Sequence, residues 1–121
     1  MKDLNPFEWK ACERPELREL LSLFYHLSIS DIDAFFSICS LSPARVENVS
    51  LKMGKDKSTV QRCINKLYSA GLILRESRCC IEGKKGRFFV YQAVSGAELK
   101  VMLSLVLDKW YKKRQDVVGS L

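Results

Sequence analysis

One stretch of the chain, residues 57–73 (KSTVQRCINKLYSAGLI), restricts the possible folds more than any other. Its apolar residues recur at helical spacing and define one buried face: Val60, Ile64 and Leu67. Asp56 precedes the stretch and suits an N-cap. Gly71 ends it, because glycine adopts the left-handed C-cap conformation without a Cβ clash. The pattern therefore predicts an amphipathic helix over residues 57–70.

The other face of this predicted helix is polar and basic. It opens with short hydrogen-bonding side chains beside long cations: Lys57, Ser58, Thr59, Gln61 and Arg62. Side chains of these types can hydrogen-bond to base edges in the major groove of DNA. We therefore interpret the 57–70 helix as a recognition helix.

The distribution of charge supports a polyanionic partner. The chain has a net charge of +6. The window from Lys55 to Arg87 holds nine lysines and arginines against three acidic residues, whereas the rest of the chain holds eleven of each. The whole excess of positive charge lies on the predicted helix and the segment after it. A localised basic surface is typical of nucleic-acid binding, although a solvated, solubilising surface is an alternative.

The segment after Gly71 has the pattern of a β-hairpin. LILRESRCCI and RFFVYQAV are rich in β-branched and aromatic residues, and a glycine-containing turn separates them. The tip, residues 82–87, is cationic. Such a tip suits the phosphate backbone or the minor groove, so we predict a basic wing.

Helices are predicted before the recognition helix as well. Residues 15–27 carry an apolar stripe after Pro15, and we expect the next helix to start at Ser30 with Asp33 completing a capping box. A third is expected from Ser42, as N-cap, to Gly54. Two short helices joined by a tight turn indicate a helix-turn-helix.

The C-terminal region, residues 95–116, predicts a long helix that begins with a capping box at Ser95 and Glu98. Apolar residues occupy much of its circumference, which indicates burial on more than one side. We interpret it as a dimerisation helix that pairs with the helix of residues 15–27; packing of these two helices within one subunit is the alternative. The dimerisation residues expected are Leu99, Met102, Leu103, Val106 and Trp110.

Together these elements predict a mainly α fold with a β-hairpin wing. We expect one domain over residues 1–121, with a winged helix-turn-helix core at 30–94 and flanking terminal helices that dimerise. No apolar run is long enough to span a membrane and the N-terminus carries no secretory signal pattern, so we expect a cytoplasmic protein. Sequence motifs for catalysis, a metal or a cofactor are absent; His26 is the one histidine. We expect neither an enzyme nor a cofactor.

Two known families resemble parts of this sequence. STVQRCINKLYSAGLILRE resembles the recognition-helix segment of MarR-type regulators, and GKKGRFFVYQAVSGAELKVML resembles the wing and following helix of archaeal TrmB-like regulators. The resemblance does not extend to the large C-terminal effector domain of full TrmB proteins or to the Asp-x-Arg wing signature of MarR proteins. The resemblance therefore implies a dimeric winged-helix transcription regulator that binds double-stranded DNA, but identifies no small-molecule effector.

The resemblance also assigns roles to individual residues. The five polar residues at the start of the recognition helix correspond to groove-facing positions, where Gln61 would pair with adenine and Arg62 with guanine. Asn65 and Lys66 would meet phosphates. The wing contacts would come from Lys84, Lys85 and Arg87.

Five cysteines raise a second hypothesis: Cys12, Cys39, Cys63, Cys79 and Cys80. An odd number without a secretory signal does not indicate a disulfide framework. Cys79 and Cys80 are neighbours on a predicted strand, close to several cations that lower a thiol pKa. A redox- or metal-responsive regulator that uses these two thiols is thus an alternative. A winged helix that binds only other proteins is another.

Overall fold

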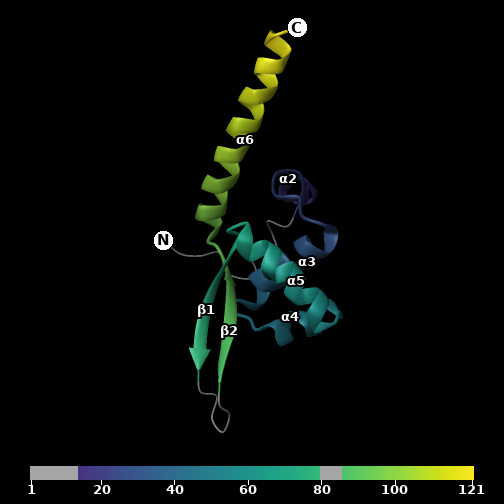
Figure 1. Cartoon of the computed structure of the whole chain (residues 1–121), viewed down its shortest axis with the longest axis vertical. Coiled ribbons are helices and arrows are strands. Elements are labelled where there is room, and N and C mark those ends of the chain that lie inside the picture. The colour runs from purple at the N-terminus through teal and green to yellow at the C-terminus, as the bar shows by residue number, and fades with distance from the viewer. Residues whose placement is uncertain (1–13, 80–85) are drawn as a thin grey trace.

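The computed structural model describes residues 14–79 and 86–121. Its elements, labelled as in Figure 1, are α2 (Pro15–Tyr25), α3 (Ile29–Leu41), α4 (Val46–Met53), α5 (Lys57–Ser69), β1 (Ile73–Cys79), β2 (Arg87–Ala93) and α6 (Gly96–Gly119). Helices α2 to α5 gather on one side of the β1–β2 hairpin, and α6 extends away from this body (Figure 1). No helix in the described ranges is long and apolar enough to cross a bilayer.

Helix α3 forms the centre of the core. It packs against α2, α4, α5 and β2. Its buried side chains point in several directions and include Ile32, Ala34, Phe35, Phe36, Ile38 and Cys39. The rings of Phe35 and Phe36 meet edge to face at 5.3 Å. Because α3 is covered on several sides, helix α5 rests on a closely packed support.

The predicted start of α3 at Ser30 is wrong. The helix begins at Ile29, with Ser28 as N-cap, and the capping box is formed by Ser28 and Asp31. The hydroxyl of Ser28 accepts from the Asp31 N–H at 3.2 Å, and Asp31 accepts from the Ser28 N–H at 2.9 Å. Asp33 instead forms an ion pair with Arg18 at 3.0 Å.

The predicted start of α4 at Ser42 is also wrong, because the chain there is extended. Ala44 pairs with Tyr91 of β2 through two backbone hydrogen bonds, of 2.8 and 2.7 Å. This pairing requires extended backbone where a helical turn was expected. The helix begins at Val46, and Asn48 accepts a hydrogen bond from the Arg45 N–H at 3.0 Å. The predicted end at Gly54 is confirmed: Gly54 is the left-handed C-cap, with φ 67°.

The hairpin is antiparallel, with Ile73 opposite Ala93 and Cys79 opposite Arg87. Its inner end is buried in the core, whereas β1 is exposed from Leu74 onward. With the short bridge at Ala44, the hairpin follows a helix-turn-helix formed by α4 and α5. The chain therefore has a winged helix-turn-helix fold, as the sequence pattern predicted.

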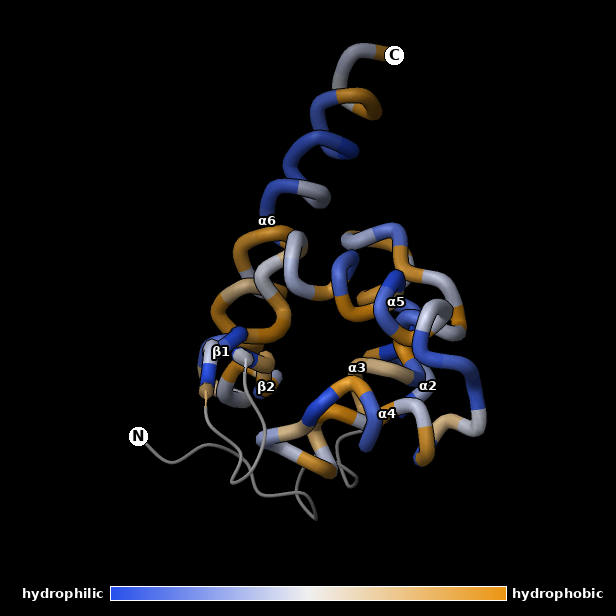
Figure 2. The backbone as a smooth tube through the Cα atoms, turned by 60° about the horizontal axis from the view of Figure 1, so that its bottom comes forward, coloured by the Kyte–Doolittle hydropathy of each residue, from blue (hydrophilic) through white to orange (hydrophobic). Residues whose placement is uncertain are grey.

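Helix α6 follows β2 after a two-residue connection. Ser95 is its N-cap, as expected, and its hydroxyl accepts from the Glu98 N–H at 3.1 Å. Figure 2 shows that the turns of α6 nearest the hairpin are hydrophobic and that the turns beyond them are largely hydrophilic. The helix thus has one end that belongs to the core and one that projects beyond it.

Candidate nucleic-acid interface

The helix predicted over residues 57–70 was located almost residue by residue. Helix α5 spans Lys57–Ser69, and its buried residues are Val60, Cys63, Ile64 and Leu67. Asp56 caps it: its side chain accepts from the Thr59 N–H at 3.1 Å and from the Thr59 hydroxyl at 2.7 Å. These bonds, those of the Thr59 side chain foremost, lower the pKa of Asp56 below its ordinary value. Gly71 has φ 79°, in the left-handed region that favours glycine.

The exposed face of α5 holds most of the polar residues singled out in the sequence. Lys57, Ser58, Arg62 and Asn65 are exposed, and Gln61 is half-buried. The amide of Gln61 donates to the Asn65 side chain at 2.9 Å, which orients Gln61 along the helix axis. Thr59 differs from the others, because its hydroxyl is already engaged by the cap.

Glu47 of α4 is an acidic residue beside this basic surface. Its carboxylate lies 3.8 Å from the ammonium of Lys57 and 3.3 Å from Nε of Arg45. The guanidinium of Arg45 also stacks on the ring of Phe88 in β2, 4.4 Å from its centroid. The sequence pattern did not single out Arg45, whose side chain links α4 to the hairpin through Glu47 and Phe88.

Arg75 joins the wing to the recognition helix. Its guanidinium lies 4.3 Å from the ring centroid of Tyr68, in α5, and 4.4 Å from that of Phe89, in β2. A cation held between two aromatic faces is attracted by both ring quadrupoles. The stack therefore fixes the hairpin beside α5. The sequence showed the three residue types but not that they meet.

Of the predicted wing contacts, Arg87 is the one that the structure describes. It is exposed at the start of β2, and its guanidinium lies 3.4 Å from the Ser77 hydroxyl. Lys84 and Lys85 lie outside the described residues, as does most of the 82–87 tip.

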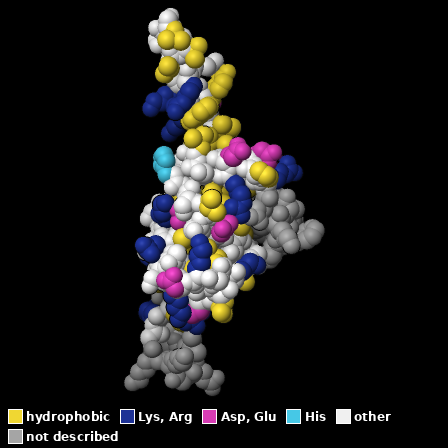
Figure 3. Space-filling model, turned by 90° about the vertical axis from the view of Figure 1, so that its right-hand side faces the viewer, with side chains coloured by type: hydrophobic (Ala, Val, Ile, Leu, Met, Phe, Trp, Pro, Cys, Tyr) yellow, Lys and Arg dark blue, Asp and Glu magenta, His cyan; other side chains and the backbone are white. Residues whose placement is uncertain are grey.

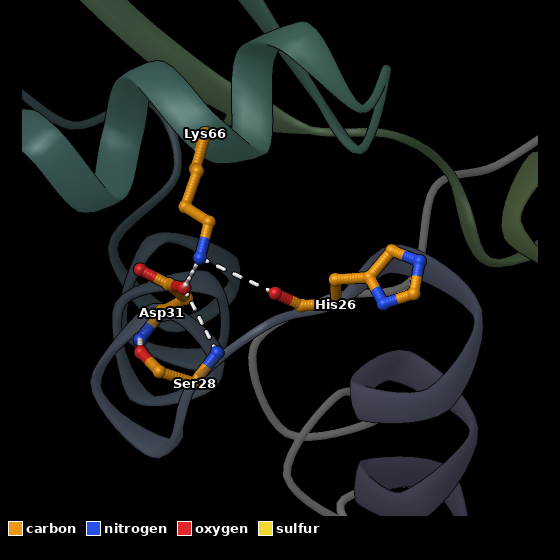
Figure 4. A network of polar contacts seen from close by, with 4 residues as sticks. All are labelled: His26, Ser28, Asp31 and Lys66. Carbon is orange, nitrogen blue, oxygen red and sulfur yellow. Dashed lines mark hydrogen bonds and ion pairs between the residues drawn. The ribbon is translucent and has the colours of Figure 1, made fainter.

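Lys66 belongs to a polar network beneath α5 (Figure 4). Its ammonium lies 2.8 Å from Asp31 and 3.2 Å from the backbone carbonyl oxygen of His26. Burial raises the pKa of the Asp31 carboxyl, but hydrogen bonds from Lys66, Ser28 and Cys63 outweigh burial and bring that pKa below its ordinary value. The imidazole of His26 points away from the network.

The cysteines that the structure describes divide into two groups. Cys39 and Cys63 are buried, and Cys79 is exposed. Burial, reinforced by the Asp31 carboxylate, raises the pKa of the Cys63 thiol to about 11, so Cys63 stays protonated. Cys12 and Cys80 lie outside the described residues, and the ranges 14–79 and 86–121 contain no cluster able to hold a metal ion. The thiol-switch hypothesis for Cys79 and Cys80 stays a prediction.

The predicted dimerisation residues are not equivalent. Leu99 is buried in the subunit core, and Met102 and Leu103 pack against that core. Val106 and Trp110 lie further along α6, where Trp110 approaches Phe24 of α2 with ring centroids 6.4 Å apart. Other apolar side chains are exposed along the same helix: Val101, Leu105, Leu107, Tyr111, Val117 and Val118. Figure 3 shows hydrophobic side chains gathered along this projecting helix.

The fold is a winged helix-turn-helix, and the second helix of its helix-turn-helix, α5, exposes a polar face. The model of the sugar-specific transcriptional regulator TrmB matches residues 21–97. This match covers the second half of α2, all elements from α3 to β2, and the start of α6, so the chain belongs to the TrmB family.

Relatives in sequence and in structure are archaeal and bacterial. The uncharacterized protein MJ1503 of Methanocaldococcus jannaschii is 28% identical over 84% of this chain and 76% of its own length. A possible transcriptional regulator from Methanosarcina mazei has a similar structure, with a TM-score of 0.75 at 18% identity over 91% of this chain and 92% of that one. A crystal structure of MarR superposes with a TM-score of 0.50 at 18% identity, over 79% of this chain and 70% of that one. At these identities the two structures support the fold alone.

Proposed function

We propose that this chain is a dimeric, sequence-specific regulator that binds double-stranded DNA, with α5 in the major groove and the basic wing on the backbone or in the minor groove. The observation that carries the proposal is the two-sided character of α5. Its inner residues Val60, Ile64 and Leu67 are fully buried, while its outer face presents exposed polar and cationic side chains. The window that contains this helix and the wing also holds the whole excess positive charge.

Gln61 and Arg62 are the proposed base-reading residues. The hydrogen bond from Gln61 to Asn65 restrains the Gln61 amide before DNA arrives, which lowers the entropy lost on pairing with adenine. Arg62, the next residue, is exposed, and its guanidinium can donate two hydrogen bonds to the O6 and N7 atoms of guanine. Lys57 and Arg87, with Lys84 and Lys85, would neutralise phosphates.

The dimer is proposed to form through the projecting part of α6. Beyond Leu103 the helix projects from the body, which it still contacts through Trp110 and Phe24, and apolar side chains continue on one broad side of it. We call this side the outer α6 surface: Val106, Leu107, Trp110, Tyr111, Val117 and Val118. Its residues are spaced at three, four and seven positions, which is the spacing of a helix-pairing seam. A second copy of this chain would cover it and set two recognition helices about one DNA turn apart, roughly 10 bp.

The test is a fluorescence-anisotropy titration of arbitrary duplex DNA at several salt concentrations. We expect a plot of the logarithm of affinity against the logarithm of salt concentration to have a negative slope of several units. Each neutralised phosphate contributes about 0.9 to the size of that slope. After selection of a preferred site, Arg62→Ala should relax the preference at one base pair, with a cost of about 1–3 kcal/mol for the preferred base. A protein that contacts only other proteins would show no salt-dependent binding, and that result would contradict the proposal. A DNA-bound regulator of this kind would act in the cytoplasm.

A further inference from the structure

Lys66 lies on the recognition helix, and its half-exposed side chain reaches toward the start of α3 and the end of α2 (Figure 4). The ammonium meets the carboxylate of Asp31 at the start of α3 and the carbonyl oxygen of His26 at the end of α2. Asp31 is 4% exposed, and the same carboxylate oxygen accepts the backbone N–H of Ser28. The end of α2 and the start of α3, neighbours in sequence, thus meet the distant recognition helix at one cation.

Withdrawing Lys66 from this network would be costly. A buried carboxylate has lost most of its water, and it tolerates this loss only while cations and N–H groups replace the water. If the ammonium swung outward to a DNA phosphate, Asp31 would lose its nearest positive charge. The carbonyl of His26 would lose a donor at the same time. The bound position of Lys66 is therefore the favourable one in free and DNA-bound protein alike.

We propose that Lys66 is a positioning residue of the DNA-reading surface: its ammonium fixes the recognition helix to α3 and to the end of α2, and it does not neutralise a phosphate. The inference rests on the proposed DNA-binding function. It also replaces the sequence-based expectation that Lys66 meets phosphates.

The place of His26 gives this anchor a wider role. His26 has φ 55°, a left-handed conformation that ends α2 and aims its carbonyl at Lys66. Two residues earlier, Phe24 meets Trp110 of α6. The anchor consequently joins the recognition helix to the segment of α2 that contacts the projecting helix. In a dimer paired through α6, the spacing between the two recognition helices depends on the contacts that connect α5 to α2 and α2 to α6.

The experiment compares Lys66→Gln with Lys57→Gln, because both variants remove one cation from the same helix. Lys57→Gln should reduce the salt slope on arbitrary duplex DNA by about 0.9, the contribution of one phosphate. Lys66→Gln should leave that slope unchanged. It should instead lower the ratio of specific to non-specific affinity by about tenfold, the order of one well-oriented base contact.

Asp31→Asn is the second variant. It removes the negative charge that holds the Lys66 ammonium but leaves every cation in place. It should reduce the specificity ratio in the same direction as Lys66→Gln, again with an unchanged salt slope. Lys66→Arg keeps the positive charge and should restore most of the ratio. A drop in slope for Lys66→Gln equal to that of Lys57→Gln would overturn the proposal and return Lys66 to the phosphate contacts.

Amide hydrogen exchange separates failure of this inference from failure of the proposed function. In DNA-free protein, Lys66→Gln should speed exchange in α5 and at the Ser28 N–H, whereas Lys57→Gln should leave both unchanged. Unaltered exchange in Lys66→Gln would refute the anchor, whether or not DNA binds. Absence of DNA binding by the wild-type chain with faster exchange in Lys66→Gln would refute the proposed function but keep the anchor.

Discussion

Helices α3 and α6 are both apolar around much of their circumference, but they differ in how much of that apolar surface is buried within the subunit. Helix α3 buries residues on every side against α2, α4, α5 and β2. In α6 the subunit buries Leu99, near the first turn, and leaves Leu105 and Leu107 about half exposed or more, at 61% and 46%. The same sequence pattern therefore corresponds to a central helix in one case and a projecting helix in the other.

The difference teaches what an apolar circumference does and does not specify. It indicates that a helix needs apolar neighbours on several sides, because exposed hydrocarbon is unfavourable in water. It does not say whether those neighbours belong to the same subunit. For α3 the structure supplies them. For α6 we propose that a second copy supplies them.

The largest expected effect tests the central helix. Phe35 is fully buried in α3, so Phe35→Ala should lower the free energy of unfolding by about 3–5 kcal/mol. Urea denaturation at two protein concentrations measures it. The loss should be the same at both concentrations, because the cavity lies inside one subunit. A loss of less than 1 kcal/mol would show that α3 is not the centre of the core.

The next effect tests the projecting helix. Leu107→Lys places a charge on the outer α6 surface and should weaken dimerisation by about 2 kcal/mol or more, near thirtyfold in dissociation constant. Sedimentation velocity over a range of concentrations measures it. Leu105→Lys makes the same chemical change on the other side of the helix and should leave the dimer intact. If Leu105→Lys dissociates the dimer and Leu107→Lys does not, the dimer forms through the opposite side of α6 and not through the outer α6 surface.

How far the sequence could predict these features depends on how local they are. The bounds of α5 follow from neighbours, Asp56 and Gly71, and they were predicted within a residue. The start of α3 was not, because Ser28-x-x-Asp31 and Ser30-x-x-Asp33 are equally good capping patterns. Burial of Asp31 decides between them, and burial depends on the whole fold.

Tertiary contacts decide the remaining differences. The start of α4 is displaced by the pairing of Ala44 with Tyr91, a residue 47 positions later in the chain. The contact that directs the Lys66 side chain is with Asp31, 35 positions earlier. A helical pattern locates the cation on the recognition helix, but it cannot show which partner the ammonium reaches.

A smaller effect concerns the start of α3, where Asp31 ties the central helix to α5. The folded-state pKa of Asp31 lies below its ordinary value of 3.8, so its carboxylate stabilises the fold above that pH. The stabilisation declines below pH 3.8 and is lost as pH falls through the lower folded-state pKa, when the carboxylate takes up a proton in the folded protein. Asp31→Asn should cost about 1–2 kcal/mol at pH 7. Urea midpoints between pH 7 and acid should converge for the two proteins, and parallel curves would contradict this role.

The smallest effect concerns the hairpin that leads into α6. Arg75 stacks between Tyr68 and Phe89, so Arg75→Ala should lower the stability by about 1 kcal/mol while the core of α3 stays intact. Arg75→Lys keeps the charge but loses the flat guanidinium, and it should recover only part of the loss. Because β2 runs directly into α6, loosening this stack also loosens the base of the projecting helix. Hydrogen exchange should therefore rise along β1 and β2 and in the first turn of α6, but not in α3; a rise confined to α3 would show that the stack does not hold the hairpin.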